Sequence, residues 1–531
     1  MPLPTSDITW PPAQLDGISR RMAEWSAWYE GTPDALRAAY AGDRATAPTR
    51  PSQTRGGVVG AVARWWWGRP AADQAATRGQ LHIPLAADLC QASADLLFAE
   101  PPTLTVDDTA AQDRLDVLAG DGLYATLAET AEIGAALGGS YLRVTWDQEI
   151  VPEGAFLTSV HADGAWPEFR WGRLVGVTFW RVIASDDRHV VRHLERHELD
   201  GAGIGIVLHG LYEGTRDQLG HAIPLIDHAS TEGLAGLVDE LGAISTLTPG
   251  LAVTYIPNQR PQRSWRTHPL GMNLGRSDLD GVEPLMDALD ETWSSWMRDI
   301  RLGKGRIMAA QSLLESHGPG SGTTFDADRE VFSPVNAPPD QSIESLVTAS
   351  QFAIRVAEHQ QTANELIQQI LRTAGYSAAT FGEGAEGMAT ATEVNAREQR
   401  SDLTRDRKIR HWRPGGSQIL TKLLAVDAAL GFPGAVRTDK PVQLEFGPSV
   451  QDSPLELAQT AQALSVAQAA STKTRVQLVH PDWDEPKVDE EVRLINAELA
   501  GAAVADPAAL GAGGTGLDAS FPAELGGAGQ A

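Results

Sequence analysis

Four carboxylates recur at helical spacing in one stretch of the chain, at Asp280, Glu283, Asp287 and Asp290. Residues three or four apart lie on the same side of a helix, so these side chains would form one acidic stripe. A stripe of carboxylates repels phosphate groups, which suits a wall past which a polyanion slides. The ordinary alternative is a solvated helix face. Both interpretations stay open from these residues alone.

A basic cluster lies further along the chain, in a helix predicted to begin near Thr392. It includes Arg397, Arg400, Arg405 and Arg407. In a chain with a formal net charge of −26, clustered arginines favour an anionic partner such as phosphate. Carboxylates of the same helix could instead pair with them, and these are Glu393, Glu398, Asp402 and Asp406.

Histidines are the next residues that could do chemistry. His193 and His197 lie near Glu195 and Glu198, and a metal-dependent hydrolase could use such a set. Their order is not the His-Glu-x-x-His of a zinc helix. With His189, their spacing fits alternation along a strand, so one polar sheet face is the competing interpretation.

Nucleotide-binding and nucleophile signatures are absent from the sequence. The run Gly303-Lys304-Gly305 lacks the upstream glycine and the trailing Ser or Thr of a P-loop. No Gly-x-Ser-x-Gly run occurs either. The sequence therefore predicts a protein that is not an enzyme, with no catalytic residue, no metal and no cofactor.

Two long helices would position the carboxylates. Apolar side chains alternate spacings of three and four from Leu279 to Ile300, which predicts a first helix over 277–302, roughly 39 Å long. Pro284 either opens this helix or kinks it. A second apolar pattern predicts a helix from Ile343 to Ala374, with two short elements around a turn between the helices.

The segment 376–391 is rich in Gly and Ala, which predicts a mobile loop. Short alternating β runs over 140–256 include Gly172–Ile183, Arg188–Leu199 and Gly203–Tyr212. The residues before Tyr40 favour a packing helix. We therefore expect an α+β fold that is mostly helical.

Bulk composition limits the classes of protein that fit. A chain of 531 residues exceeds what one core usually serves, so two or more domains are expected. The single cysteine, Cys90, argues against a disulfide framework. Neither a basic leader nor a run of about eighteen apolar residues occurs, which predicts a soluble, intracellular or assembly-bound protein without membrane contact. The acidic balance disfavours tight DNA binding but suits a conduit for DNA.

Short motifs in a fixed order resemble the portal protein of tailed double-stranded-DNA bacteriophages, the ring at one capsid vertex through which the genome passes. The resemblance implies a portal-like fold with wing, stem, clip and crown regions. The motifs that carry it are Trp65–Arg69, His82–Ala86, Asp95–Pro102, Gly138–Trp146, Gly275–Leu279, Thr392–Val394 and Arg407–Trp412.

The resemblance also implies a role for each region. The regions, in chain order, are the wing over 1–274, the first stem helix over 275–302, the clip over 303–341, the second stem helix over 342–375, the tunnel loop over 376–391, the following helix and return to the wing over 392–453, the crown over 454–500 and a disordered tail over 501–531.

By the same resemblance, the protein would pack, retain and eject DNA as a virion component, assembled in the host cytoplasm. Its partners would be further copies in a twelvefold ring, the major capsid and scaffolding proteins, the terminase large subunit and a head-tail adaptor. A scaffolding or adaptor protein without a conduit is the alternative. The channel-lining or DNA-facing candidates are Asp280, Glu283, Asp287, Asp290, Phe381, Glu383, Glu386, Met388, Arg397, Arg400, Arg405 and Arg407.

Overall fold

The structure is a computed structural model that divides into two compact units, Met1–Gly447 and Pro448–Ala531. Helices and antiparallel sheets are both present, so the predicted α+β class is confirmed. The described residues are 3–5, 7–41, 81–120, 122–302, 306–309, 315–316, 323–324, 347–350, 355–382, 391–447, 454–480 and 483–503.

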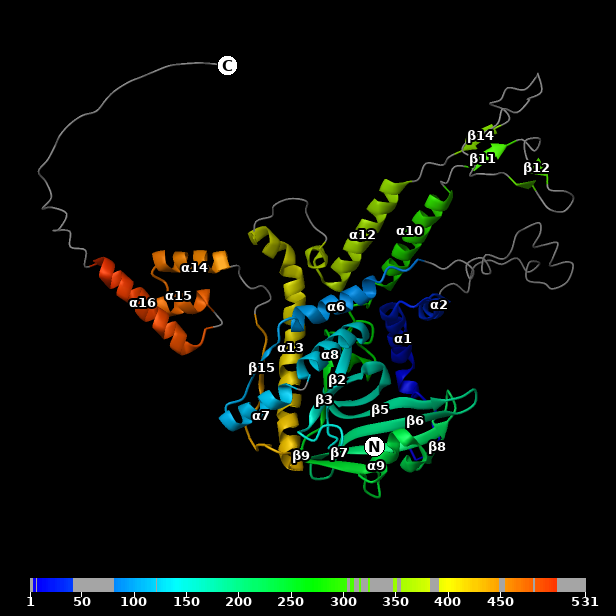
Figure 1. The fold of residues 1–531 in the computed structure, drawn as a ribbon. Coiled ribbons are helices and arrows are strands. Elements are labelled where there is room, and N and C mark those ends of the chain that lie inside the picture. The colour runs from blue at the N-terminus through cyan, green and yellow to red at the C-terminus, as the bar shows by residue number, and fades with distance from the viewer. Residues whose placement is uncertain are drawn as a thin grey trace, which may run out of the picture. The chain divides into compact units, whose positions relative to one another are not determined.

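Helices α1, α6 and α8 of the first unit pack on one another (Figure 1). On α1, Ile18, Met22 and Trp25 recur at helical spacing and are all buried, which is why this face meets the core. The helices of this unit are α1 (Asp16–Glu30), α2 (Pro33–Ala41), α6 (Leu85–Phe98), α7 (Thr109–Ala119), α8 (Leu123–Leu137), α9 (Ala229–Ala235), α10 (Glu283–Leu302), α12 (Val356–Ala374) and α13 (Ala391–Leu430).

Two larger sheets occupy the region 139–257. One has the strand order β10-β2-β3 and the other β4-β5-β6-β7-β8, with β9 also paired to β7. The predicted β runs are found as β5, β6 and β7. The strands of the two sheets are β2 (Gly139–Thr145), β3 (Phe156–His161), β4 (Ala165–Arg170), β5 (Arg173–Ser185), β6 (Val190–Leu199), β7 (Ile204–Gly214), β8 (His221–Ile223), β9 (Ala243–Pro249) and β10 (Val253–Pro257).

The first predicted long helix begins later than expected. It is α10, which starts at Glu283, so Pro284 lies in its first turn, where the missing N–H breaks no helical hydrogen bond. Leu279 and Val282 precede the helix and are buried in the core. The helix therefore begins six residues after the predicted start at 277, Pro284 opens it rather than kinking it, and α10 is about 30 Å long.

The second predicted helix is also shorter. α12 begins at Val356, and the upstream residues Val347–Ser350 form strand β14, which pairs with β11 (Arg306–Ala309). Arg306 lies opposite Ser350, and Ala309 opposite Val347. The apolar run near residue 347 is therefore a strand rather than a helical turn. A second short pair is β12 (Glu315–Ser316) with β13 (Thr323–Thr324).

Helix α13 organises a second core under the β10-β2-β3 sheet. Its apolar residues Ile419, Leu420, Leu423 and Leu424 are buried there. Pro414 lies inside this 40-residue helix, and the small residues that follow it let the helix approach β10 and the pair β1 (Thr103–Thr105) with β15 (Gln443–Glu445). The core of the first unit thus joins sheets and helices from distant parts of the sequence.

The second unit contains α14 (Pro454–Val466), α15 (Thr472–Val479) and α16 (Glu485–Ala503). α15 packs on both of its neighbours, and Val476 and Val488 are buried. The segment predicted to be a disordered tail, 501–531, lies outside the described residues from position 504 onward.

Candidate functional site

Helices α10 and α12 form a hairpin that continues into a β-ladder. The helices pack on each other, and the indole of Trp296 stacks on the imidazole of His359 with 6.1 Å between ring centroids. His359 Nε2 lies 3.0 Å from Asp299 Oδ2, so an acid of α10 also holds α12. The chain then leaves both helices toward β11 and β14, which pair with each other. This arrangement makes 283–374 one continuous hairpin at the described positions.

Two of the predicted channel carboxylates are buried inside the subunit. Glu283 is 4% exposed, accepts a 2.7 Å hydrogen bond from Trp25 Nε1 and forms a 2.7 Å ion pair with Arg21. Burial raises the pKa of Glu283. Asp290 is 1% exposed and accepts a 2.9 Å hydrogen bond from Ile83 N. These contacts correct the prediction of a surface stripe, because the two side chains bind α1 and the segment before α6.

The other two carboxylates differ in exposure. The Asp280 side chain lies 3.5 Å from Arg21 and is 8% exposed, so it too is largely buried within the subunit. Asp287 is half-buried and also has partners within the chain. The acidic edge of the first helical pattern is therefore mainly a packing edge within this subunit, with a partly exposed remainder.

The arginines of α13 divide in the same way. Arg405 is buried and donates to the carbonyls of Leu96 at 2.6 Å and Gly447 at 2.7 Å, and burial lowers its pKa. This placement corrects the prediction that Arg405 faces DNA. Arg400 and Arg407 are exposed, and Arg400 donates to a carbonyl at the end of α12. Nothing is described of the side chain of Arg397.

Of the predicted loop residues, Phe381 lies within the described part. It is half-buried in the short 3-10 helix η6 (Ala378–Phe381), with its ring 6.2 Å from that of Tyr376. Glu383, Glu386 and Met388 lie outside the described residues.

A buried polar network that the sequence did not predict joins these elements. Asp278 Oδ2 accepts hydrogen bonds from Lys408 Nζ at 2.5 Å and from Tyr376 Oη at 2.7 Å. Asp278 Oδ1 accepts from the amides of Asn258 and Gln259, both at 2.9 Å. A carboxylate with this many donors is satisfied despite complete burial. The segment before α10, the end of α12 and the middle of α13 are thereby held together.

Charge in this network is balanced within the core. Lys408 also donates to Ser93 of α6 and lies 3.0 Å from the Tyr376 hydroxyl. Burial lowers the pKa of Lys408, and the Asp278 carboxylate opposes that shift. Burial and Asp278 together raise the pKa of Tyr376. A signal in the sequence is the helical spacing of Ser401, Thr404 and Lys408, which places them on one side of α13. Ser401 and Thr404 are buried as well.

The histidines form a polar layer of the sheets rather than a metal site. His193 Nε2 lies 3.2 Å from His209 Nδ1, and the two rings stack. Glu195 accepts from His197 at 2.7 Å and pairs with Arg143 of β2. In the described ranges, no group of three or more potential ligands is placed to hold a metal ion.

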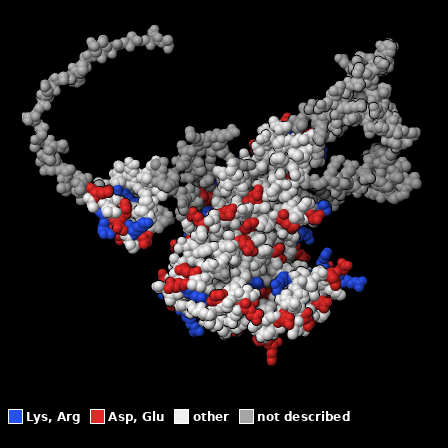
Figure 2. Space-filling view, in the orientation of Figure 1, with Lys and Arg blue, Asp and Glu red and all other residues white. Residues whose placement is uncertain are grey.

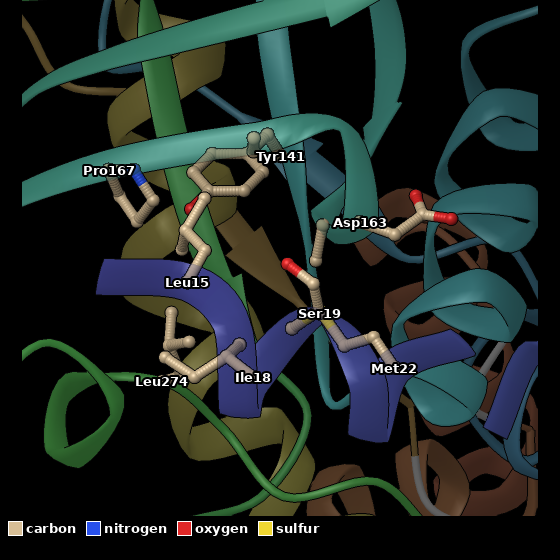
Figure 3. Close-up of a pocket in the computed structure, with 10 residues that line it drawn as sticks. Leu15, Ile18, Ser19, Met22, Tyr141, Asp163, Pro167 and Leu274 are labelled. Carbon is tan, nitrogen blue, oxygen red and sulfur yellow. The ribbon is translucent and has the colours of Figure 1, made fainter. Parts of the chain in front are cut away.

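Figure 3 shows a small enclosed cavity between α1, β2 and the start of β4. Leu15, Ile18 and Tyr141 face one another across it, with Met22 and Leu274 nearby. Its volume of about 10 Å³ has room for roughly one water molecule, far below the size of a typical small-ligand site. This cavity therefore supplies no substrate site.

The chain can be compared with curated proteins and with solved structures. No curated protein matches the chain. A solved structure described as the neck of a native GTA particle, computed with C12 symmetry, aligns at 13% sequence identity and a TM-score of 0.38, covering 75% of this chain and 90% of that one. No helix among the described residues is long and apolar enough to cross a membrane.

The family comparison is more extensive. Residues 219–504, more than half of the chain, match the family model of the phage portal protein, SPP1 Gp6-like. The family consists of structural components of the phage capsid and head-tail connector rather than enzymes. The chain belongs to the SPP1 Gp6-like family of phage portal proteins.

Proposed function

We propose that copies of this chain form a closed ring through which double-stranded DNA is packaged, retained and ejected. The observation that supports this most is the hairpin of α10 and α12 that runs into the β11-β14 ladder. Such a hairpin has few partners of its own: most described α12 side chains before Leu366 are exposed. Neighbouring copies in a ring would cover it, because head-to-tail contacts close on themselves at a fixed rotation.

The regional roles follow from this ring. We assign α10 and α12 to the stem, residues 303–355 to the clip, residues 382–391 to the tunnel loop and residues 454–500 to the crown. The loop is shorter than the 376–391 expected from sequence, because Tyr376 is buried in the Asp278 network and Ala378–Phe381 form η6. The clip assignment extends the 303–341 expected from sequence, because β14 pairs with β11. Residues 1–274, together with the part of 392–453 that returns to them, would form the wing.

The candidates for facing DNA become fewer once burial is considered. Asp287, Phe381, Arg400 and Arg407 keep exposed or half-exposed side chains, whereas the Asp280 side chain is 8% exposed. The net charge of −26 would keep the duplex from adhering to the wall, since tight DNA binding depends on many cationic contacts with phosphate. Glu383, Glu386, Met388 and Arg397 stay as candidates from the sequence.

The partners would follow from the regions. The clip would meet the terminase large subunit during packaging and the head-tail adaptor afterwards. The wing and crown would meet the major capsid and scaffolding proteins, in a virion assembled in the host cytoplasm. The protein would contribute no catalysis of its own, so the energy for packaging would come from the terminase.

Native mass spectrometry and electron micrographs of the purified protein test the ring. We expect one closed oligomer, which a twelvefold ring would show as a single mass of twelve subunits. A protein that stays monomeric under assembly conditions would contradict the proposal.

A scaffolding or adaptor role without a conduit requires a separate test. Deletion of Gly382–Gly387 should leave ring assembly intact but reduce the DNA content of particles if the segment belongs to a conduit. Deletion of the same number of residues at 512–517, within the predicted disordered tail, serves as the control. Unchanged DNA content in the deletion variant would favour the adaptor.

A further inference from the structure

An exposed basic surface surrounds the buried Asp278 network. Three of the segments that contribute to the network carry an arginine nearby: Arg260 follows Gln259, Arg276 precedes Asp278 by two residues, and Arg407 precedes Lys408. Arg276 Nη2 donates to Gln259 Oε1 at 2.6 Å, which fixes the first two segments side by side. We define the basic surface as Arg260, Arg263, Arg276, Arg407 and Arg410.

These arginines repel one another. Burial and Arg263 lower the pKa of Arg276, Asp278 and Asp280 oppose that shift, and Arg407 adds to it. The neighbouring carboxylates Asp278 and Asp280 are bound to Lys408 and Arg21. Arg260 donates to the carbonyls of Met272 and Asn273, and Arg276 donates to the Gln259 side chain, so these contacts are with neutral groups. In a chain of net charge −26, so concentrated a positive surface needs a negative partner.

An aromatic residue lies at the edge of this surface. The tip of the β4-β5 hairpin carries Trp171, which is 97% exposed and has a positive φ of 52°. A Cβ on Gly172 would lie 3.9 Å from Asn273 Oδ1, and Arg260 donates to the Asn273 carbonyl at 2.6 Å. Trp and Arg are enriched at the energetic centres of protein-protein interfaces. The combination therefore favours a protein partner over the phosphates of DNA, which removes Arg407 from the DNA-facing candidates.

The same chain carries a matching acidic surface on α6 and α8. It consists of Asp88, Asp95, Glu129 and Glu132, which are exposed or half-exposed. Helices α6 and α8 pack on each other, and Glu132 raises the pKa of Asp95, after the effect of burial. Asp and Glu predominate on the face of the body shown in Figure 2, where α6 and α8 lie in Figure 1.

Asp88 and Asp95 lie on the side of α6 away from the Asp278 network. Asp88 and Asp95 are two turns apart on one edge of α6. Ser93, which accepts from Lys408, lies roughly 140° around the helix from Asp88. The acidic edge of α6 therefore faces away from Lys408, where a neighbouring copy could meet it. Different patches that meet in this way make a head-to-tail contact, the type that generates a ring.

We propose that the basic surface, with Trp171 at its edge, docks on the acidic surface of α6 and α8 in the neighbouring copy. This inference rests on the ring proposed above and names the contact that closes it.

Charge reversal tests the contact. Arg263→Glu with Arg410→Glu should reduce the fraction of subunits in rings at least tenfold in native mass spectrometry, and Asp88→Arg with Glu129→Arg should do the same. All four changes in one chain should restore the rings, because the charges again complement each other. Arg188→Glu, at an exposed position on the β5-β6 turn, is the matched control, and thermal unfolding checks that each variant is folded.

The outcomes separate the two proposals. If the Arg263→Glu, Arg410→Glu variant forms rings in the same fraction as the wild-type protein, the docking contact is overturned and the proposed ring is not. Folded variants that lose the ring but do not regain it with all four changes overturn the acidic surface as the partner. Intact rings that instead lose retention of double-stranded DNA reassign the arginines to phosphate. Absence of rings in the wild-type protein overturns the ring and the contact together.

Discussion

The Lys408 ammonium lies 2.5 Å from Asp278 Oδ2, and both side chains are almost completely buried. Asp278 precedes α10, whereas Lys408 is in the middle of α13, so 130 residues separate the two. Tyr376, two residues after the end of α12, donates a hydrogen bond to the same carboxylate oxygen. This ion pair therefore ties the base of the α10-α12 hairpin to the helix that follows the proposed tunnel loop.

Removal of either charge should destabilise the subunit strongly. We expect Lys408→Met or Asp278→Asn to cost about 3–5 kcal/mol, because each leaves the opposite charge buried without its partner. Urea unfolding measures this as a lower midpoint. Arg407→Met, at the exposed neighbouring position, should change stability by less than about 0.5 kcal/mol.

The double variant of Lys408→Met and Asp278→Asn adds a second test of the pair. It should be less destabilised than the sum of the single variants, since neither charge is then left alone. Strict additivity would show that the two charges do not interact.

Acid should weaken the β-sheet region through two buried histidines. Burial lowers the pKa of His193 to about 3 and that of His209 to about 4, well below the ordinary value of 6.5. Between pH 6.5 and 4, the unfolded chain binds protons that the folded chain does not, so stability falls as the pH falls. We expect a loss of roughly 2 kcal/mol for each histidine between pH 6.5 and 5.

Thermal unfolding at a series of pH values measures this loss. His209→Gln should flatten the dependence above pH 5, whereas His189→Gln, at an exposed position, should leave it unchanged. Glu195 adds a further loss at lower pH, because Arg143 and His197 hold the pKa of this buried carboxylate well below its usual value despite burial. A midpoint that rises on acidification would contradict the assignment.

Periodicity predicted much of the fold but few of the contacts. The period-two spacing of His193 and His197 correctly indicated a strand, which is β6. The helical spacing from Met286 onward correctly indicated α10. Val347–Ser350 was assigned to a helix because a short apolar run fits either structure, and only its pairing with Arg306–Ala309 decides between them.

Site residues were harder to predict because their roles depend on neighbours distant in sequence. Glu283 and Asp287 look alike in the stripe, yet only Glu283 meets Trp25 and Arg21 of α1. Arg405 and Arg407 are two residues apart, and Arg405 alone faces the carbonyls of Leu96 and Gly447. A helical period identifies a face but does not identify what covers that face.

The buried acid of α10 should act on stability rather than on DNA. Glu283→Leu is expected to cost about 2–4 kcal/mol, because Arg21 and the Trp25 indole lose their acceptor in a buried site. Asp287→Asn, at a half-buried position, should cost less than about 1 kcal/mol. Chemical unfolding of the two variants decides between them, and equal effects would argue against the packing role of Glu283.

Gly275 should tolerate no side chain, because the chain passes very close to the end of α8 at this point. A Cβ at position 275 would lie 2.0 Å from the carbonyl oxygen of Gly138 and 2.9 Å from Asn258 N, both backbone atoms that cannot rotate away. Asn258 N donates to that Gly138 oxygen at 3.0 Å, and the Asn258 amide binds Asp278. Gly275→Ala should therefore displace Asn258 and weaken the Asp278 network, with a cost in stability above about 3 kcal/mol.

Gly281→Ala is a useful comparison, since its φ of 93° strains a side chain but no atom lies within 4 Å of the new Cβ. Urea midpoints that fall less for Gly275→Ala than for Gly281→Ala would show that this close approach does not limit stability.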